Sequence, residues 1–140
     1  MNWINELKGK IPDYAKDARL NLDGISRAAF DTDQLQGLML AAAFATGNKA
    51  LQNLIDSGME NRAEATAALT AASLMAMNNV WYPYNEMSGD AFKGLPLGLR
   101  MNAYSTFGGT SKVRFESYAL VASIIGRCEF CVKSHFELLK

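Results

Sequence analysis

The chain has 140 residues, of which 49% are hydrophobic and 20% are charged, and its 14 basic side chains balance 14 acidic ones. This length is typical of one domain, and the composition is that of a globular protein rather than a disordered one. With no net positive charge to neutralise phosphates, the composition indicates no nucleic-acid partner.

The N-terminal residues 1–8 contain no basic segment followed by an apolar run, so we expect no secretory signal. Charged side chains interrupt every apolar run before it reaches the roughly 18 residues that span a bilayer. We therefore expect a cytoplasmic protein without a membrane segment. In that reducing compartment, two cysteines three residues apart are more typical of redox or metal chemistry than of a structural disulfide.

Apolar residues recur at helical spacing through most of the chain, and no segment alternates with the period of a strand. The expected fold is therefore all-α, a single helical domain over residues 1–140. Capping and breaking residues divide it into helices over about 3–10, 13–24, 32–46, 63–77, 111–125 and 128–140, with a short helix between Asn48 and Gly58. Asn61 and Glu64 have the spacing of a capping box, and the alanine-rich helix that follows them is expected to be central.

Residues 78–110 break this pattern. They contain two of the three prolines, five of the eleven glycines and six aromatic residues. We expect one long irregular connection, with a helical turn near Leu99 to Tyr104. Connections of this length in compact domains usually serve as lids or interfaces.

Both cysteines and the only histidine lie within eight residues, from Cys128 to His135. On a helix, Cys128, Cys131 and His135 share one face, because they are spaced three and four residues apart. The helix N-terminus favours a thiolate, and a histidine one turn further on can pair with it or give it a proton. Proximity to the helix start favours Cys128 as the nucleophile and the nearby histidine favours Cys131, so the spacing leaves both open.

Two other interpretations of the cluster remain. The cysteines could be a buried, inert pair, or part of a zinc site. Zinc in a structural site takes four ligands, whereas Cys128, Cys131 and His135 supply three, with only Glu116 or Glu129 in reserve.

Glu116 precedes Cys128 by twelve residues, which is about 18 Å along a straight helix. The two side chains can approach each other only if the chain turns at Gly126-Arg127 and the two helices bend or cross. Ser123, seven residues after Glu116 and so on the same face, is a candidate to lie between them.

The pattern Glu116, Ser123 and Gly126-x-Cys128-x-x-Cys131-x-x-x-His135 resembles the active-site signature of the alkylhydroperoxidase AhpD and carboxymuconolactone decarboxylase superfamily. The resemblance covers practically the whole chain. It extends to residues 11–17, 20–22, 75–82 and 98–102, and it favours the AhpD branch over the decarboxylase branch, whose members lack the cysteine chemistry.

The resemblance implies an AhpD-like helical bundle that forms a homotrimer and has alkyl hydroperoxidase activity. No bound cofactor is implied. The reductant would be a dihydrolipoyl group on a lipoylated acyltransferase, and an AhpC-type peroxiredoxin would be regenerated. The resemblance also implies site roles: Cys131 attacks the peroxide, Cys128 resolves the sulfenic acid, and Glu116 and His135 form a proton relay.

Two features depart from the family pattern. Phe130 stands where some members have a histidine before the second cysteine. Family members also continue with further helices, whereas this chain ends five residues after His135. We therefore expect the catalytic motif within 112–140, in a domain that lacks the C-terminal helices of the family. The alternatives to a peroxidase are a carboxymuconolactone-decarboxylase-like enzyme acting on a lactone acid and a shortened, non-catalytic assembly module.

Overall fold

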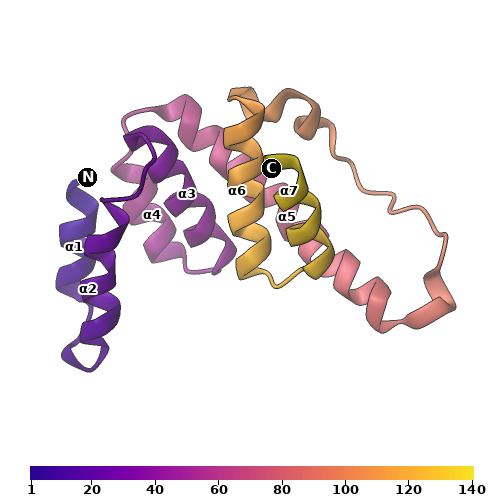
Figure 1. Ribbon diagram of the computed structural model, residues 1–140, viewed down its shortest axis with the longest axis horizontal. Coiled ribbons are helices and arrows are strands. Elements are labelled where there is room, and N and C mark those ends of the chain that lie inside the picture. The colour runs from indigo at the N-terminus through magenta and orange to yellow at the C-terminus, as the bar shows by residue number, and fades with distance from the viewer.

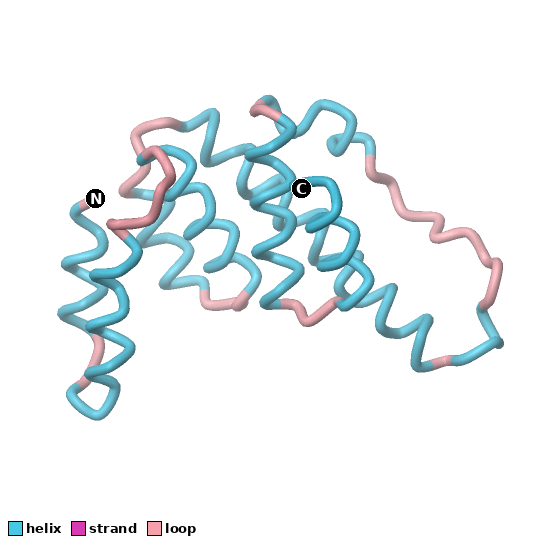
Figure 2. Tube along the Cα trace, viewed as in Figure 1, coloured by secondary structure: helices cyan, strands magenta, loops and turns pink.

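A computed structural model describes all 140 residues, and it contains seven α-helices, three short 3-10 helices and no strand (Figures 1 and 2). The all-α prediction is therefore confirmed. The α-helices are α1 (Asn2–Lys10), α2 (Lys16–Ile25), α3 (Thr32–Ala45), α4 (Lys49–Ser57), α5 (Arg62–Met87), α6 (Lys112–Ile125) and α7 (Glu129–Leu139). The 3-10 helices are η1 (Asp13–Ala15), η2 (Gly89–Phe92) and η3 (Asn102–Gly109). No helix is both long and apolar enough to cross a membrane.

Local capping explains why four helices begin where the sequence predicts. The side chains of Asp31, Asn48, Asn61 and Ser111 each accept a hydrogen bond from the backbone N–H three residues later, at 3.0–3.3 Å. These bonds satisfy donors that have no partner inside the helix. They start α3, α4, α5 and α6.

Helices α3, α5 and α6 form the centre of the bundle, with α7 packed against α5 and α6 (Figure 1). Fully buried alanines on all three helices allow their backbones to approach closely. Gly37 on α3 meets the ring of Tyr118 on α6, and a Cβ at Gly37 would lie 2.5 Å from that ring. The core thus depends on small residues facing large ones.

The capping box is only half formed. Asn61 caps α5, but the Glu64 carboxylate does not turn back to it. Instead the buried carboxylate accepts hydrogen bonds from the hydroxyls of Tyr118 and Thr110 and from the Arg114 guanidinium. Glu64 therefore joins α5 to α6 rather than completing a local cap.

The predicted end of the central helix, near Met77, is wrong. Helix α5 continues to Met87 and contains Pro83, so the irregular connection is shorter than expected. A proline inside a helix loses one backbone hydrogen bond, but contacts on this part of α5 support the helix. The ring of Tyr82 stacks on the ring of Phe130 of α7, with 4.1 Å between their centroids. The rings of Tyr84 and Phe92 are tilted against each other, with 5.5 Å between their centroids.

The connection after η2 runs outside the bundle and returns at η3 (Figure 2). The turn expected near Leu99 to Tyr104 lies further along the chain, at Asn102–Gly109. At the other end of the molecule, α1 and α2 form a hairpin beside α4 (Figure 1). Trp3 and Ile4 of α1 join the core, whereas α2 buries no residue and Tyr14 is 93% exposed. The apolar spacing on α2 therefore does not mark a core face.

Candidate functional site

The turn between α6 and α7 brings the two ends of the motif together. The backbone N–H of Cys128 donates to the carbonyl of Ser123 at 3.2 Å, and that of Arg127 donates to Ile124 at 3.1 Å. This is the Schellman arrangement, in which the residue after the helix cap adopts a left-handed conformation. Arg127 has that conformation, with φ 55°. The chain then reverses, and α7 packs along α6 (Figure 1).

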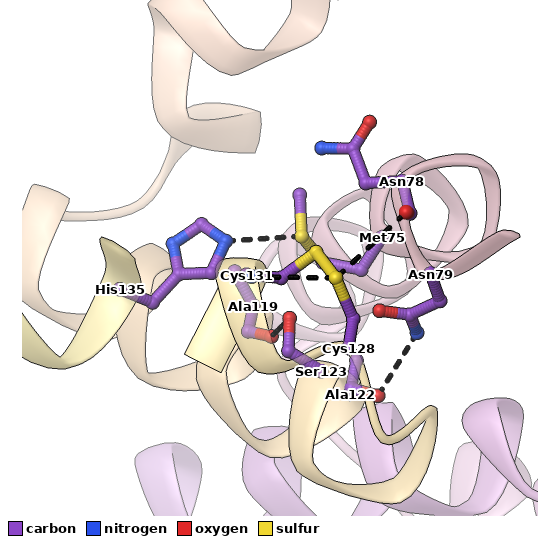
Figure 3. Close-up of a disulfide and its surroundings, with 9 residues drawn as sticks. All are labelled: Met75, Asn78, Asn79, Ala119, Ala122, Ser123, Cys128, Cys131 and His135. Carbon is purple, nitrogen blue, oxygen red and sulfur yellow. Dashed lines mark hydrogen bonds between the residues drawn. A yellow bond between two sulfur atoms is a disulfide. The ribbon is translucent and has the colours of Figure 1, made fainter. Parts of the chain in front are cut away.

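Gly126 ends α6 as predicted, but its backbone is ordinary, with φ −72°. Space is what requires a glycine, because a Cβ at Gly126 would lie 2.1 Å from Nδ2 of Asn79. That Asn79 amide donates to the carbonyl of Ala122 at 3.1 Å (Figure 3). The turn is thus attached to α5.

Cys128 and Cys131 form a disulfide, with an S–S distance of 2.04 Å (Figure 3). Cys128 is the N-cap residue of α7, and its sulfur accepts the backbone N–H of Cys131 at 3.3 Å. Both cysteines are buried, with 0% and 2% of their surface exposed. Because the disulfide uses both sulfurs, neither is a thiolate ligand for zinc in this state.

Glu116 and His135 meet in the buried space between α6 and α7. Oε2 of Glu116 lies 2.6 Å from Nδ1 of His135, and their residues are 1% and 5% exposed. The other carboxylate oxygen, Oε1, accepts a hydrogen bond from the Tyr104 hydroxyl of η3. The hairpin therefore brings Glu116 to the histidine, which lies nearly two turns beyond Cys128 on α7.

The second nitrogen of His135, Nε2, lies 3.0 Å from the sulfur of Met75 on α5. In Figure 3 the Met75 thioether stands between the imidazole and the disulfide. Neither ring nitrogen is hydrogen bonded to a cysteine sulfur in the disulfide form, since their partners are Glu116 and Met75.

Ser123 does not bridge Glu116 and Cys128, contrary to the prediction. Its buried hydroxyl donates to the Ala119 carbonyl of its own helix at 2.8 Å. The backbone carbonyl of Ser123 accepts a hydrogen bond from the N–H of Cys128. Ser123 therefore shapes the turn that presents the disulfide.

Tyr104 and Met75 belong to the site but were not predicted from the sequence. Tyr104 lies in the segment read as an irregular connection, and Met75 is one of seven methionines, so neither carries a local signal. Burial, together with the hydrogen bond to Glu116, raises the pKa of Tyr104 above its usual range. The phenol thus remains a hydrogen-bond donor across the neutral range.

An aromatic pair adjoins the disulfide. Phe130, between the two cysteines in sequence, is about half exposed and stacks on Tyr82. The position where some AhpD proteins have a histidine thus supplies an apolar contact between α7 and α5. It supplies no third titratable group.

The fold and site together define an all-helical protein with a buried Cys-X-X-Cys disulfide beside a carboxylate–imidazole pair. No protein-family model matches the chain. Curated relatives do: it is 41% identical over 141 residues to the alkyl hydroperoxide reductase AhpD of Beijerinckia indica, covering 97% of this chain and 78% of the relative. It is 39% identical to the AhpD proteins of Rhodospirillum centenum (94% and 73% covered) and Corynebacterium aurimucosum (97% and 78%). The chain belongs to the AhpD family of alkyl hydroperoxide reductases.

Proposed function

We propose that this protein reduces alkyl hydroperoxides through a dithiol–disulfide cycle of Cys131 and Cys128, with Glu116 and His135 as the proton relay. The observation that carries the proposal is the disulfide of the motif, buried one turn from a Glu116–His135 pair. The identity to AhpD proteins along nearly the whole chain supports the same assignment.

In the first step, Cys131 gives its proton to His135, and Glu116 stabilises the resulting imidazolium. The thiolate attacks one oxygen of the hydroperoxide, so that an S–O bond forms and the O–O bond breaks. The alkoxide takes the imidazolium proton and leaves as an alcohol. Cys131 is then a sulfenic acid.

In the second step, Cys128 gives its proton to the relay and its thiolate attacks the Cys131 sulfur. Hydroxide leaves and takes that proton from the relay to become water, giving the disulfide. Cys128 suits this role because the N–H of Cys131 points at its sulfur, and hydrogen bonding to a thiolate stabilises it.

The relay operates in the reduced form. In the disulfide form Nε2 of His135 faces Met75, and a thioether is a weak acceptor. A thiolate at Cys131 is a stronger one. Reduction therefore supplies the partner that draws the imidazole from Met75 toward the cysteines.

The reductant in this proposal is a dihydrolipoyl group on a lipoylated acyltransferase, whose two thiols exchange with the disulfide and leave as a lipoyl disulfide. An AhpC-type peroxiredoxin is a further redox partner, and the protein works in the cytoplasm as a homotrimer. The resemblance to AhpD proteins supports these assignments. Because both sulfurs are shielded within one chain, exchange requires local opening at the start of α7.

The test is reduction of cumene hydroperoxide with dihydrolipoamide as the electron donor. We expect turnover in the wild type and none in Cys128→Ser or Cys131→Ser. Ser73→Ala is the matched control, because that exposed serine bonds only to its own helix. Turnover that survives in Cys131→Ser would refute the assignment of the nucleophile.

Two further outcomes separate the alternatives. An activity that does not depend on the cysteines would favour a decarboxylase-like enzyme. A disulfide that dihydrolipoamide leaves intact, measured by thiol titration, would favour a non-catalytic module.

A further inference from the structure

We propose that Tyr104 is a positioning residue of this site: its hydroxyl donates to the Glu116 carboxylate and keeps that carboxylate turned toward His135. The inference rests on the proposed function only in treating Glu116 and His135 as the relay. The hydrogen-bond geometry itself belongs to the disulfide form and can be tested without a substrate.

The two oxygens of Glu116 have different partners. Oε2 faces Nδ1 of His135 and Oε1 accepts the Tyr104 hydroxyl. A carboxylate buried to 1% exposure loses its hydration, and a hydrogen bond to the charged form offsets part of that loss. Tyr104 binds the oxygen that the imidazole does not, and its ring lies 6.3 Å from the His135 ring between centroids, so it fixes the plane of the carboxylate.

The contacts of His135 distinguish its two ring nitrogens. Because a carboxylate accepts hydrogen bonds, Nδ1 donates to Glu116. Nε2 faces the Met75 sulfur at 3.0 Å and is the nitrogen left to take up a proton from a cysteine.

No other charged group competes for Glu116. Tyr104 faces it from η3 and His135 from α7, while Met75 of α5 reaches it only through the imidazole. Arg114, the basic residue closest to it in sequence, is turned to Glu64 at 3.0 Å and Asp31 at 2.5 Å. The hydroxyl of Tyr104 is thus the one neutral donor on the carboxylate.

The packing of η3 fixes where Tyr104 lies. Its ring meets the edge of Phe115, 5.4 Å between centroids, and that of Phe107 at 6.4 Å. Beyond Phe107 the chain turns through Gly108, where a Cβ would lie 2.9 Å from the backbone of Ala67 on α5. A segment held against both α5 and α6 places the hydroxyl on Glu116.

The sole histidine of the chain makes a direct test possible, because His135 gives one imidazole signal pair in 15N-labelled protein. The disulfide form is titrated with acid, and the shifts report when the hydrogen bond from Nδ1 to the Glu116 carboxylate is lost. In Tyr104→Phe, which keeps the ring, we expect the midpoint to move to higher pH by about one unit, because the ionised carboxylate has lost a hydrogen bond.

Tyr84→Phe is the matched control, since it removes the hydroxyl of a half-exposed tyrosine at the far end of α5 and should leave the midpoint unchanged. Glu116→Gln removes the carboxylate, so the transition that leaves should be the same with and without Tyr104→Phe. An unchanged midpoint in Tyr104→Phe would overturn the proposal.

The hydroperoxide assay supplies the second readout. We expect Tyr104→Phe to lower kcat more than it changes KM, and to move the acidic limb of the rate profile in the same direction as the NMR midpoint. A shifted midpoint in a protein that reduces no hydroperoxide would retain Tyr104 as the positioning residue and refute the proposed function. A shifted midpoint with an unmoved rate profile would refute the role of Tyr104 in the relay.

Discussion

Replacing Arg127 by glycine is expected to stabilise the protein, although it removes a long side chain beside the redox site. Arg127 has φ 55° at the position of a Schellman turn where glycine is usual. Its exposed side chain makes no hydrogen bond or ion pair, so the substitution removes backbone strain and no contact of that kind.

The size of the effect follows from two opposing contributions. The left-handed conformation costs an L-residue about 1–2 kcal/mol. Glycine adds freedom to the unfolded chain, which costs about 0.5–1 kcal/mol. The expected net gain for Arg127→Gly is therefore about 0.5–1 kcal/mol, or a Tm higher by roughly 2–4 °C in a chain of this size.

Urea unfolding at fixed protein concentration measures this gain, with the disulfide intact in one series and reduced in the other. The contrasting variant is Gly126→Ala, whose Cβ would displace Asn79 and break its hydrogen bond to Ala122. Such crowding should cost about 1–3 kcal/mol. A destabilised Arg127→Gly, or a neutral Gly126→Ala, would refute the division of roles between the two residues.

Two further predictions concern the other side of the site. Burial and hydrogen bonds to Glu116 and Glu64 raise the pKa values of Tyr104 and Tyr118 in the folded protein. The stability that these two tyrosines supply is therefore complete below the pKa of tyrosine in the unfolded chain, about 10, and is lost as the pH rises beyond it. A spectrophotometric titration should leave two phenols neutral in the native protein at a pH where the urea-unfolded chain has ionised all five, and simultaneous ionisation in both states would contradict this. Gly108→Ala should cost about 2 kcal/mol or more in urea unfolding, because it adds crowding against Ala67 to the strain of φ 58°. Gly109→Ala, with φ 88° and open space, should cost less, and equal losses would contradict the role of the close approach.

Local signals allowed most helix boundaries to be predicted. Asp31, Asn61 and Ser111 each cap a helix through a hydrogen bond to a residue three positions later, and the turn after Ile125 is equally local. The residues that set these helix ends are therefore adjacent in the sequence. Helix α5 shows the limit. Pro83 is a local signal for an end, but the packing of Tyr82 on α7 is tertiary, and the helix continues.

The site divides in the same way. The shared face of Cys128, Cys131 and His135 followed from spacing on one helix. The contact between Glu116 and His135 depends on the direction of α7 after the turn, and spacing alone did not fix that direction. The hydroxyl of Tyr104 comes from a separate segment, and nothing in its immediate sequence indicates a partner twelve residues away.

The N-cap of α7 is the sulfur of Cys128, so the oxidation state of the disulfide affects the stability of the helix. A thiolate at Cys128 accepts the Cys131 N–H more strongly than a disulfide sulfur does. If reduction stabilises the start of the helix, thermodynamic linkage requires that the intact helix favours the reduced form over the disulfide by the same free energy. Each turnover of the proposed cycle would then alternately tighten and loosen the first turn of α7, the part of the chain that we propose opens to admit a thiol.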